Sequence, residues 1–403
     1  MNGKQTPLES TRADQKNAFL LIIFLGIVSL FGDITYEGAR SVTGPFLSTL
    51  GANAAVVGLV AGLGEFMGYA LRLASGYVAD RTGRYWAMVF IGYGLLLTVP
   101  MLALASYWQM AALLIVAERA GKAIRTPARD TILSHSTRQV GRGWGFAVHE
   151  ALDQVGAIVG PLIFSTVIYL NLGFRKGFAL LIVPALLTLF FLAITRIKFP
   201  SPEKFKAPPE TREQPGTAKL PRVFWWYSLF IFVSVAGYAN FLLISYHFKV
   251  ESIISDAQIP ILYAVAMAVD AVVALIIGRV YDRVGLSSLI TVPLLTIPIP
   301  MLAFSHSQPA AIASIVLWGA VMGIQETVMR AAIADLTPLK RRGFAYGIFN
   351  TVYGGAWLLG SILMGLLYEL SIGYICLFVV AAEAISIPLI IKVKRAALLH
   401  EKH

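Results

Sequence analysis

Long apolar stretches separated by short polar turns dominate this chain. Twelve of them are about 20 residues long or longer, which is the length an α-helix needs to cross a bilayer. They lie at roughly 18–46, 54–79, 86–106, 108–127, 143–169, 177–197, 222–248, 258–280, 288–305, 309–334, 343–369 and 372–392. The pattern predicts an all-α integral membrane protein with twelve transmembrane helices.

One polar segment divides these stretches into two sets of six. Residues 199–221 are rich in proline and mixed charges, a composition that cannot bury a core and is typical of a flexible tether. We therefore predict a six-helix bundle at 1–198, a cytoplasmic linker at 199–221 and a second six-helix bundle at 222–403.

Short motifs recur about 200 residues apart, one copy in each predicted bundle. Residues 76–84 read Gly-Tyr-Val-Ala-Asp-Arg-Thr-Gly-Arg, and residues 278–285 read Gly-Arg-Val-Tyr-Asp-Arg-Val-Gly, an offset of 202. Arg142-Gly143 is echoed by Arg342-Gly343, an offset of 200. Two repeats packed around a central site are how many secondary transporters are built, so the repeat indicates a transporter.

Composition and charge place the chain in a membrane. Apolar residues make up 57% of it and charged residues 14%, against about 45–50% and 25% in soluble domains. The predicted inner segments carry 25 Lys and Arg residues and the outer loops three, which predicts both termini in the cytoplasm and a multi-pass protein of the inner (plasma) membrane. Basic loops beside an anionic leaflet account for the net charge of +11, so no nucleic-acid partner is expected.

Several chemistries are absent from the sequence. The single Cys376 excludes an intrachain disulfide and a cysteine metal cluster. The chain has no phosphate-binding Gly-Lys-Ser/Thr loop, no His-Glu-x-x-His and no Gly-x-Ser-x-Gly. We therefore expect no enzyme, no metal site and no cofactor, and an energy source that is a gradient rather than ATP.

The turn after the second stretch resembles the signature of the major facilitator superfamily, and the matching turn of the second half carries a weaker copy. The resemblance implies two six-helix bundles related by a pseudo-twofold axis along the membrane normal, rocking around a midplane cavity. We expect a monomer in the lipid bilayer. The motif residues, with their counterparts and a basic neighbour, form the candidate cytoplasmic gate: Gly76, Asp80, Arg81, Gly83, Arg84, Arg129, Asp282 and Arg283.

Asp80 has a physical role in this gate. At the end of its helix it can accept hydrogen bonds from a facing helix N-terminus near Gly343, where the helix dipole favours an anion. The resemblance suggests that this contact latches the cytoplasmic side when the cavity opens outward. The alternative is a tight turn with solvated charges.

The fifth stretch carries Gly156, Gly160 and Pro161, which resemble the Gly-x-x-x-Gly-Pro signature common in proton-driven antiporters of the family. Gly-x-x-x-Gly alone would be a close helix-packing face. Arg119, at the centre of the fourth stretch, resembles a position found in proton-coupled members. The first resemblance favours an exporter, and the second favours proton coupling.

Ten ionisable residues lie inside the predicted helices of the N-terminal half, and each would cost about 2.5–3.5 kcal/mol uncompensated at the membrane centre. Most must therefore face one another or a wet cavity. Asp33, Glu37 and Arg40 stand at i, i+4 and i+7, on one helix face. The candidate residues for proton coupling and the central cavity are Asp33, Glu37, Arg40, Glu65, Arg72, Arg119, Lys122, Glu150 and Asp153.

The C-terminal half contains fewer charges. Glu326 and Arg330 form an i, i+4 pair that can simply neutralise itself. Aromatic and amide side chains can contact a substrate, although each can equally be a core residue. The candidate substrate-cavity residues of this half are Asn240, Tyr246, Gln325, Glu326, Arg330, Asn350 and Trp357.

The sequence thus predicts a secondary transporter that exports a small organic compound against proton entry. Asp33 and Glu37, one helical turn apart, repel when both are ionised, which favours one of them as the proton carrier. Two alternatives stay open. The same charges could serve uptake of a small metabolite, or the fold could be used without transport.

Overall fold

The computed structural model describes residues 7–200, 220–338 and 341–400. Nearly all of these residues are helical, and no strand occurs among them. The N-terminal half comprises α1 (Pro7–Thr49), α2 (Ala54–Thr82), α3 (Tyr85–Gly94), η1 (Leu95–Leu97), α4 (Thr98–Met101), η2 (Leu102–Leu104), α5 (Trp108–Val140), α6 (Arg142–Tyr169), α7 (Gly173–Leu180) and α8 (Ile182–Lys198).

The C-terminal half begins after the predicted linker, most of which (201–219) lies outside the described residues. It comprises α9 (Arg222–Ala236), α10 (Phe241–Val250), α11 (Gln258–Val284), η4 (Gly285–Ile290), α12 (Thr291–Thr296), α13 (Pro298–Ala303), α14 (Gln308–Leu336), α15 (Arg342–Leu370) and α16 (Ile372–His400).

Ten stretches of the described chain are long and apolar enough to span a membrane. One of them, Gln258–Ala303, is 46 residues long and holds two antiparallel spans. They separate at Gly285, whose φ of +58° suits glycine. The helix α5 is not among the ten because it carries many charges along its length. With α5 added and Gln258–Ala303 divided, the described residues contain twelve candidate spans, the number that the apolar pattern predicted.

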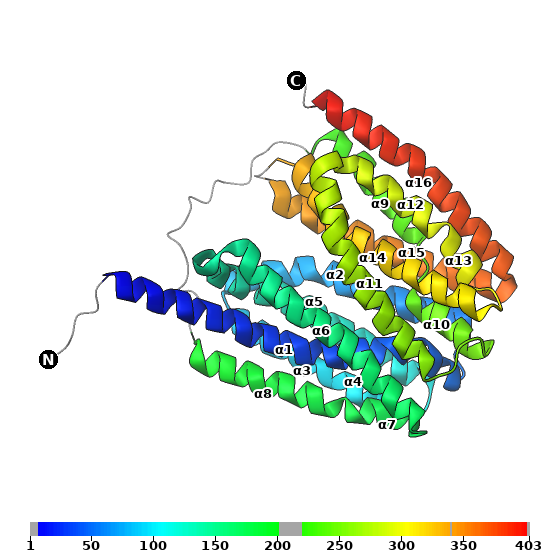
Figure 1. Ribbon diagram of the computed structural model, residues 1–403, viewed down its shortest axis with the longest axis horizontal. Helices are drawn as coiled ribbons and strands as arrows, with labels where there is room; N and C mark the ends of the chain where they lie inside the picture. Colours follow the sequence, from blue (N-terminus) through cyan, green and yellow to red (C-terminus); the bar gives the residue numbers. More distant parts are fainter. Residues whose placement is uncertain (1–6, 201–219, 339–340, 401–403) are drawn as a thin grey trace.

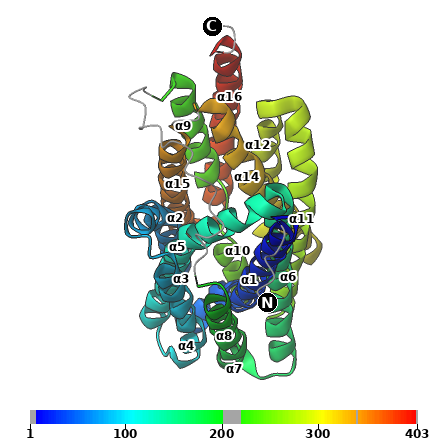
Figure 2. The same cartoon turned by 90° about the vertical axis from the view of Figure 1, so that its left-hand side faces the viewer.

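The two halves pack against each other mainly through five pairs of neighbouring helices. Figures 1 and 2 show α1–α8 as one body and α9–α16 as the other, with α2 along α15, α6 along α11, and α10 against both α1 and α2. The fifth pair is α1 and α11. We call the end where α1 and α9 begin and α8 and α16 end the terminal face. The opposite end, where α1 ends and α2 begins, is the distal face.

Close backbone contacts seal the halves together at the distal face. A Cβ atom added at Gly44 in α1 would lie 2.1 Å from the carbonyl oxygen of Leu242 in α10. One added at Gly58 in α2 would lie 2.3 Å from the carbonyl oxygen of Ser361 in α15. Glycine is therefore needed at both positions, because only a residue without Cβ lets the backbones approach this closely.

The seventh span is broken, although most of its residues are apolar. Residues 237–240 separate α9 from α10. Asn240 starts α10 as its N-cap, with its side-chain oxygen accepting the N–H of Leu242 at 2.9 Å. The indole of Trp318 donates to the carbonyl of Ala239 at 2.9 Å, and the hydroxyl of Tyr238 donates to the carbonyl of Trp318 at 2.6 Å. These bonds satisfy polar groups that a break would otherwise leave unpaired inside the membrane.

Candidate functional site

A charged cavity of about 360 Å³ lies between the two halves. Its walls come from α1, α2, α5 and α6 on one side and α11, α14 and α15 on the other. The structure brings all nine predicted N-terminal cavity residues to this wall: Asp33, Glu37, Arg40, Glu65, Arg72, Arg119, Lys122, Glu150 and Asp153. Among the candidates of the C-terminal half, Glu326, Arg330 and Trp357 join them.

Four of the C-terminal candidates lie elsewhere. Gln325 is buried and accepts a hydrogen bond from the hydroxyl of Tyr353 at 3.0 Å. Tyr246 packs edge-on against Tyr368 near the distal face. Neither of them, nor Asn350, lines the cavity. Asn240 lines a smaller hollow next to it. Spacing alone could not separate these cases, because one helix presents core and cavity faces at once.

The structure also adds cavity residues that sequence reasoning did not select. They include Tyr69, Gln154 and Asp270, which all line the wall, and Tyr36, which lines the smaller hollow beside it. Helical spacing could have placed Tyr36 on the same face, since it follows Asp33 by three residues and precedes Arg40 by four. Asp270 was recognisable as a lone intramembrane acid, but the sequence carried no sign that it meets Gln154.

The polar centre of the N-terminal half is a buried triad. Glu65 Oε1 accepts hydrogen bonds from Arg40 at 2.8 Å and from Arg119 at 2.5 Å. All three side chains are at least nine-tenths buried. Arg40 also donates to the hydroxyl of Tyr36, whose ring faces Arg119 at 4.7 Å and Lys122 at 4.1 Å. Two guanidinium groups share one carboxylate, so the triad carries a net charge of about +1.

The acids of α1 differ in how they are held. Glu37 Oε2 accepts a 2.6 Å hydrogen bond from the hydroxyl of Tyr263 in the other half, and its Oε1 lies 4.0 Å from the ammonium of Lys122. Asp33 lines the same cavity, yet within the described ranges it has no hydrogen-bond or ion-pair partner. Of the two acids, Asp33 is thus the one that a proton or a ligand can reach without breaking a contact.

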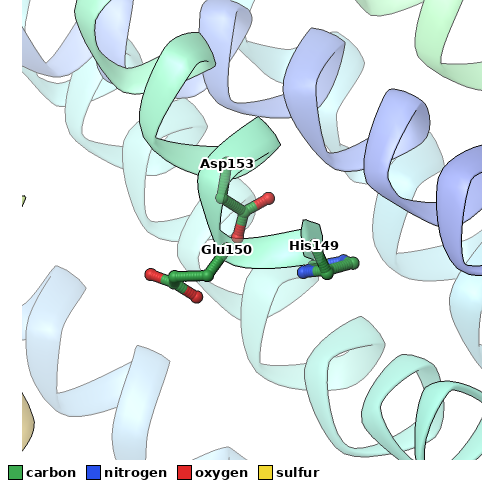
Figure 3. A group of neighbouring side chains, drawn as sticks. All are labelled: His149, Glu150 and Asp153. Atoms are coloured by element: carbon green, nitrogen blue, oxygen red, sulfur yellow. The ribbon is translucent and has the colours of Figure 1, made fainter. Parts of the chain in front are cut away.

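A second charged group lies on α6, nearer the terminal face (Figure 3). His149, Glu150 and Asp153 offer ligand atoms within 4.8 Å of one another, a spacing that could suit a metal ion. Arg129, however, lies 3.9 Å from Asp153 and donates to Ser29, which in turn contacts the His149 ring at 3.1 Å. The guanidinium already supplies a positive charge here, and this disfavours a bound cation.

Arg129 was predicted at the gate, but the structure places it in the cavity wall. The other gate residues lie at the terminal ends of α2 and α11. Asp80 is exposed, and Tyr85 of its own half donates to it at 3.4 Å. Arg81 donates to Tyr77 in its own helix. Gly83 ends α2 with a φ of +64°.

The remaining gate residues are likewise exposed or contact only their own half. Arg84 is exposed, as are Asp282 and Arg283 of the second copy. Gly76 faces Pro127 of α5, where a Cβ would lie 3.5 Å away. Within the described residues, none of the gate residues on α2 and α11 forms a hydrogen bond or ion pair with the opposite half. The cavity residues Glu150 and Arg330 are exposed as well. The halves are therefore parted at the terminal face and joined at the distal face.

The Gly156, Gly160 and Pro161 motif packs α6 against α1. Added Cβ atoms at the two glycines would lie 2.5 Å from the carbonyl oxygen of Leu30 and 2.4 Å from that of Ile34. The glycines therefore let α6 and α1 approach along the segment that carries Asp33 and Glu37. Pro161 lies inside α6.

A twelve-helix body with a charged cavity between two halves defines a multi-pass membrane transporter rather than an enzyme. The sequence model of the Major Facilitator Superfamily matches residues 22–297 and 229–396, and the chain belongs to this family.

The relatives and the solved structures agree with this assignment. An uncharacterized protein of Mycobacterium tuberculosis is 39% identical over 94% of both chains. An uncharacterized MFS-type transporter of Methanocaldococcus jannaschii is 29% identical over 90% of this chain and 91% of its own. The crystal structure of the nucleoside transporter NupG matches 93% of this chain and 98% of its own, with a TM-score of 0.66 and 16% identity. That likeness concerns the fold.

Proposed function

We propose that this protein is a proton-coupled transporter that carries a small organic compound out of the cell across the inner membrane. The observation that carries the proposal is Asp33, an acid of the cavity wall that forms no hydrogen bond or ion pair with the described residues, whereas Glu37, one turn away, is held by Tyr263 and Lys122. A carboxylate held this way in a membrane cavity is the group best able to bind and release a proton during each cycle.

The neighbours of Asp33 support a coupling role. Glu37, one turn away, bridges the halves through Tyr263. A proton bound on Asp33 lowers the repulsion between the two acids, and a cationic or polar group of a compound that enters the cavity can take the place of that proton, wherever the rest of the compound binds. Proton and compound can thus compete for one site, which is the physical basis of exchange. The halves then move around that site by alternating access.

Charge and motif support a direction. If both termini lie in the cytoplasm, as the basic loops predict, the terminal face is the cytoplasmic one and the cavity opens inward. The Gly156, Gly160 and Pro161 motif resembles that of proton-driven antiporters, which favours efflux. Uptake of a metabolite is the second candidate, because an inward-open cavity serves both directions.

Everted membrane vesicles test this proposal. Respiration acidifies their lumen, and acridine orange reports the gradient. We expect some members of a panel of organic cations, organic acids, dipeptides and nucleosides to release lumenal protons and restore fluorescence. Vesicles carrying Asp33→Asn should not respond. Alkalinisation of a lightly buffered cell suspension by the same compound would instead indicate uptake by symport. No response to any compound in either assay, with the protein present in the membrane, would contradict the proposal.

A further inference from the structure

A second, smaller hollow adjoins the charged cavity on its distal side. It measures about 30 Å³, enough for about two waters or one small polar group. Arg40, Glu65 and Arg119 belong to the walls of both spaces, so the hollow lies directly beside the central cavity. Asn240 closes it from the other half, at the first turn of α10.

Two hydrogen-bond donors in this hollow lack an acceptor. Asn240 is 1% exposed, and its Oδ1 caps α10, but its Nδ2 has no partner. Arg40 is 7% exposed, and its Nε has no partner, although both terminal nitrogens are engaged. Buried donors are almost always paired in folded proteins, since an unmet one is costly. Two unmet donors in the wall of one hollow indicate that an acceptor binds there.

Charge indicates what kind of acceptor it is. Arg40 and Arg119 share the single carboxylate of Glu65, which leaves about one positive charge at the wall. Glu118 also lines the hollow, but Arg125 offsets it at 3.5 Å. The N-terminus of α10 adds a partial positive charge. These groups together favour an anion over a neutral acceptor.

Most of the remaining wall is apolar and includes Val60, Val99, Leu102, Leu114 and Ile115. Tyr36 and Thr43 add hydroxyl groups, which already bond to Arg40 and to the carbonyl of Ala39. Only a short apolar group fits beside the donors, and the rest of a larger compound would extend into the central cavity.

We propose that this hollow binds the carboxylate of the transported compound, and that the compound is therefore an organic acid. The proposal rests on the proposed transport function and narrows its substrate class. Asn240 and Arg40 would hold the carboxylate oxygens, one from each half, so that binding adds to the existing contact between α10 and α1.

The test uses purified full-length protein and short probes, since binding can be read without transport. Thermal unfolding is followed with acetate, propionate and butyrate, and with acetamide, propionamide and butyramide as neutral matches. We expect the carboxylates to raise the unfolding temperature at lower concentration than the amides do. Asn240→Asp keeps the helix cap but replaces the free donor with a charged acceptor. It should weaken carboxylate binding by about tenfold or more.

Asn53→Asp is the matched control. Asn53 caps α2 in the same way, through the N–H of Val56 at 3.0 Å, but it is exposed at the distal face. It should leave carboxylate binding unchanged. Arg40→Lys keeps the charge and removes Nε, and it should weaken binding as Asn240→Asp does. Equal stabilisation by amides and carboxylates, or carboxylate binding that survives in Asn240→Asp, would overturn the proposal and show that the hollow holds water only.

Failure of the carboxylate proposal can be distinguished from failure of the proposed transport function. Proton exchange driven only by compounds that lack a carboxylate would leave transport standing and remove the organic-acid assignment. Carboxylate binding that depends on Asn240, without proton release in vesicles, would leave the carboxylate site standing and remove the proposed transport function.

Discussion

Glu369, near the distal end of α15, accepts a hydrogen bond from the backbone N–H of Ala54, the first residue of α2, at 2.7 Å. An acid of one half thus caps a helix N-terminus of the other, where the dipole favours it. The predicted contact of Asp80 with the start of α15 would be the same arrangement at the opposite ends of the same two helices. In this state the distal contact is made, and Asp80 has no hydrogen bond or ion pair to described residues of the other half.

We predict that Glu369→Gln opens the distal face. Glutamine keeps an acceptor but removes the charge, and a charge at a helix end contributes about 0.3–2 kcal/mol. This is enough to shift a two-state balance several-fold. A reporter cysteine at Ser361, buried where α2 meets α15, in a Cys376→Ser background should react several-fold faster with an impermeant maleimide added outside. Glu251→Gln, also at the distal face, should leave the rate unchanged.

Asp80→Asn should act in the opposite sense. The charge stabilises only the state in which the terminal face is closed, so its loss favours the terminal-open state. A reporter cysteine at Gln154, in the cavity wall, should be labelled faster in everted vesicles, while expression stays close to that of the parent. Labelling rates that match the parent would contradict a latch at this position.

Two glycines of α2 allow a matched pair of alanine substitutions that tests whether close packing of α2 against α15 seals the distal face. A methyl group at Gly58 would meet the carbonyl oxygen of Ser361, which is backbone and cannot move aside, whereas one at Gly68 has nothing within 4 Å. We expect Gly58→Ala to loosen α2 from α15 and raise distal labelling. Because the reporter at Ser361 lies at the contact itself, a cysteine at Val57 serves here. Gly68→Ala should behave as the parent, and equal rates in both variants would contradict the seal.

The fold was largely predictable because bilayer thickness and basic loops constrain apolar patterns strongly. The charged residues of α1, α2, α5 and α6 were predictable as cavity residues because a charge inside the membrane is costly unless it faces another charge or a wet cavity. The break at residues 237–240 was not, because Gly237 and Asn240 can also lie within an unbroken transmembrane helix. The bond between Glu37 and Tyr263 was also hidden, since it depends on how the two halves dock.

Glu65→Gln should destabilise the protein strongly. It leaves Arg40 and Arg119 buried without their shared carboxylate, and breaking a buried pair costs about 3–5 kcal/mol. Asp130→Asn is the control, because Asp130 pairs with Arg129 at 3.0 Å with a side chain that is 46% exposed, where such pairs contribute about 0–1 kcal/mol. Thermal unfolding in detergent compares them. Equal unfolding temperatures would contradict the structural role of the triad.

The central claim is that Asp33 couples compound movement to protons, and uphill transport tests it most directly. Proteoliposomes with an imposed pH gradient are given a compound that released protons in vesicles. The parent should accumulate it above equilibrium. Asp33→Asn should exchange it across the membrane without accumulation, because binding survives while the proton carrier is lost. Accumulation that persists in Asp33→Asn, in Glu37→Gln and in the double variant would contradict the account.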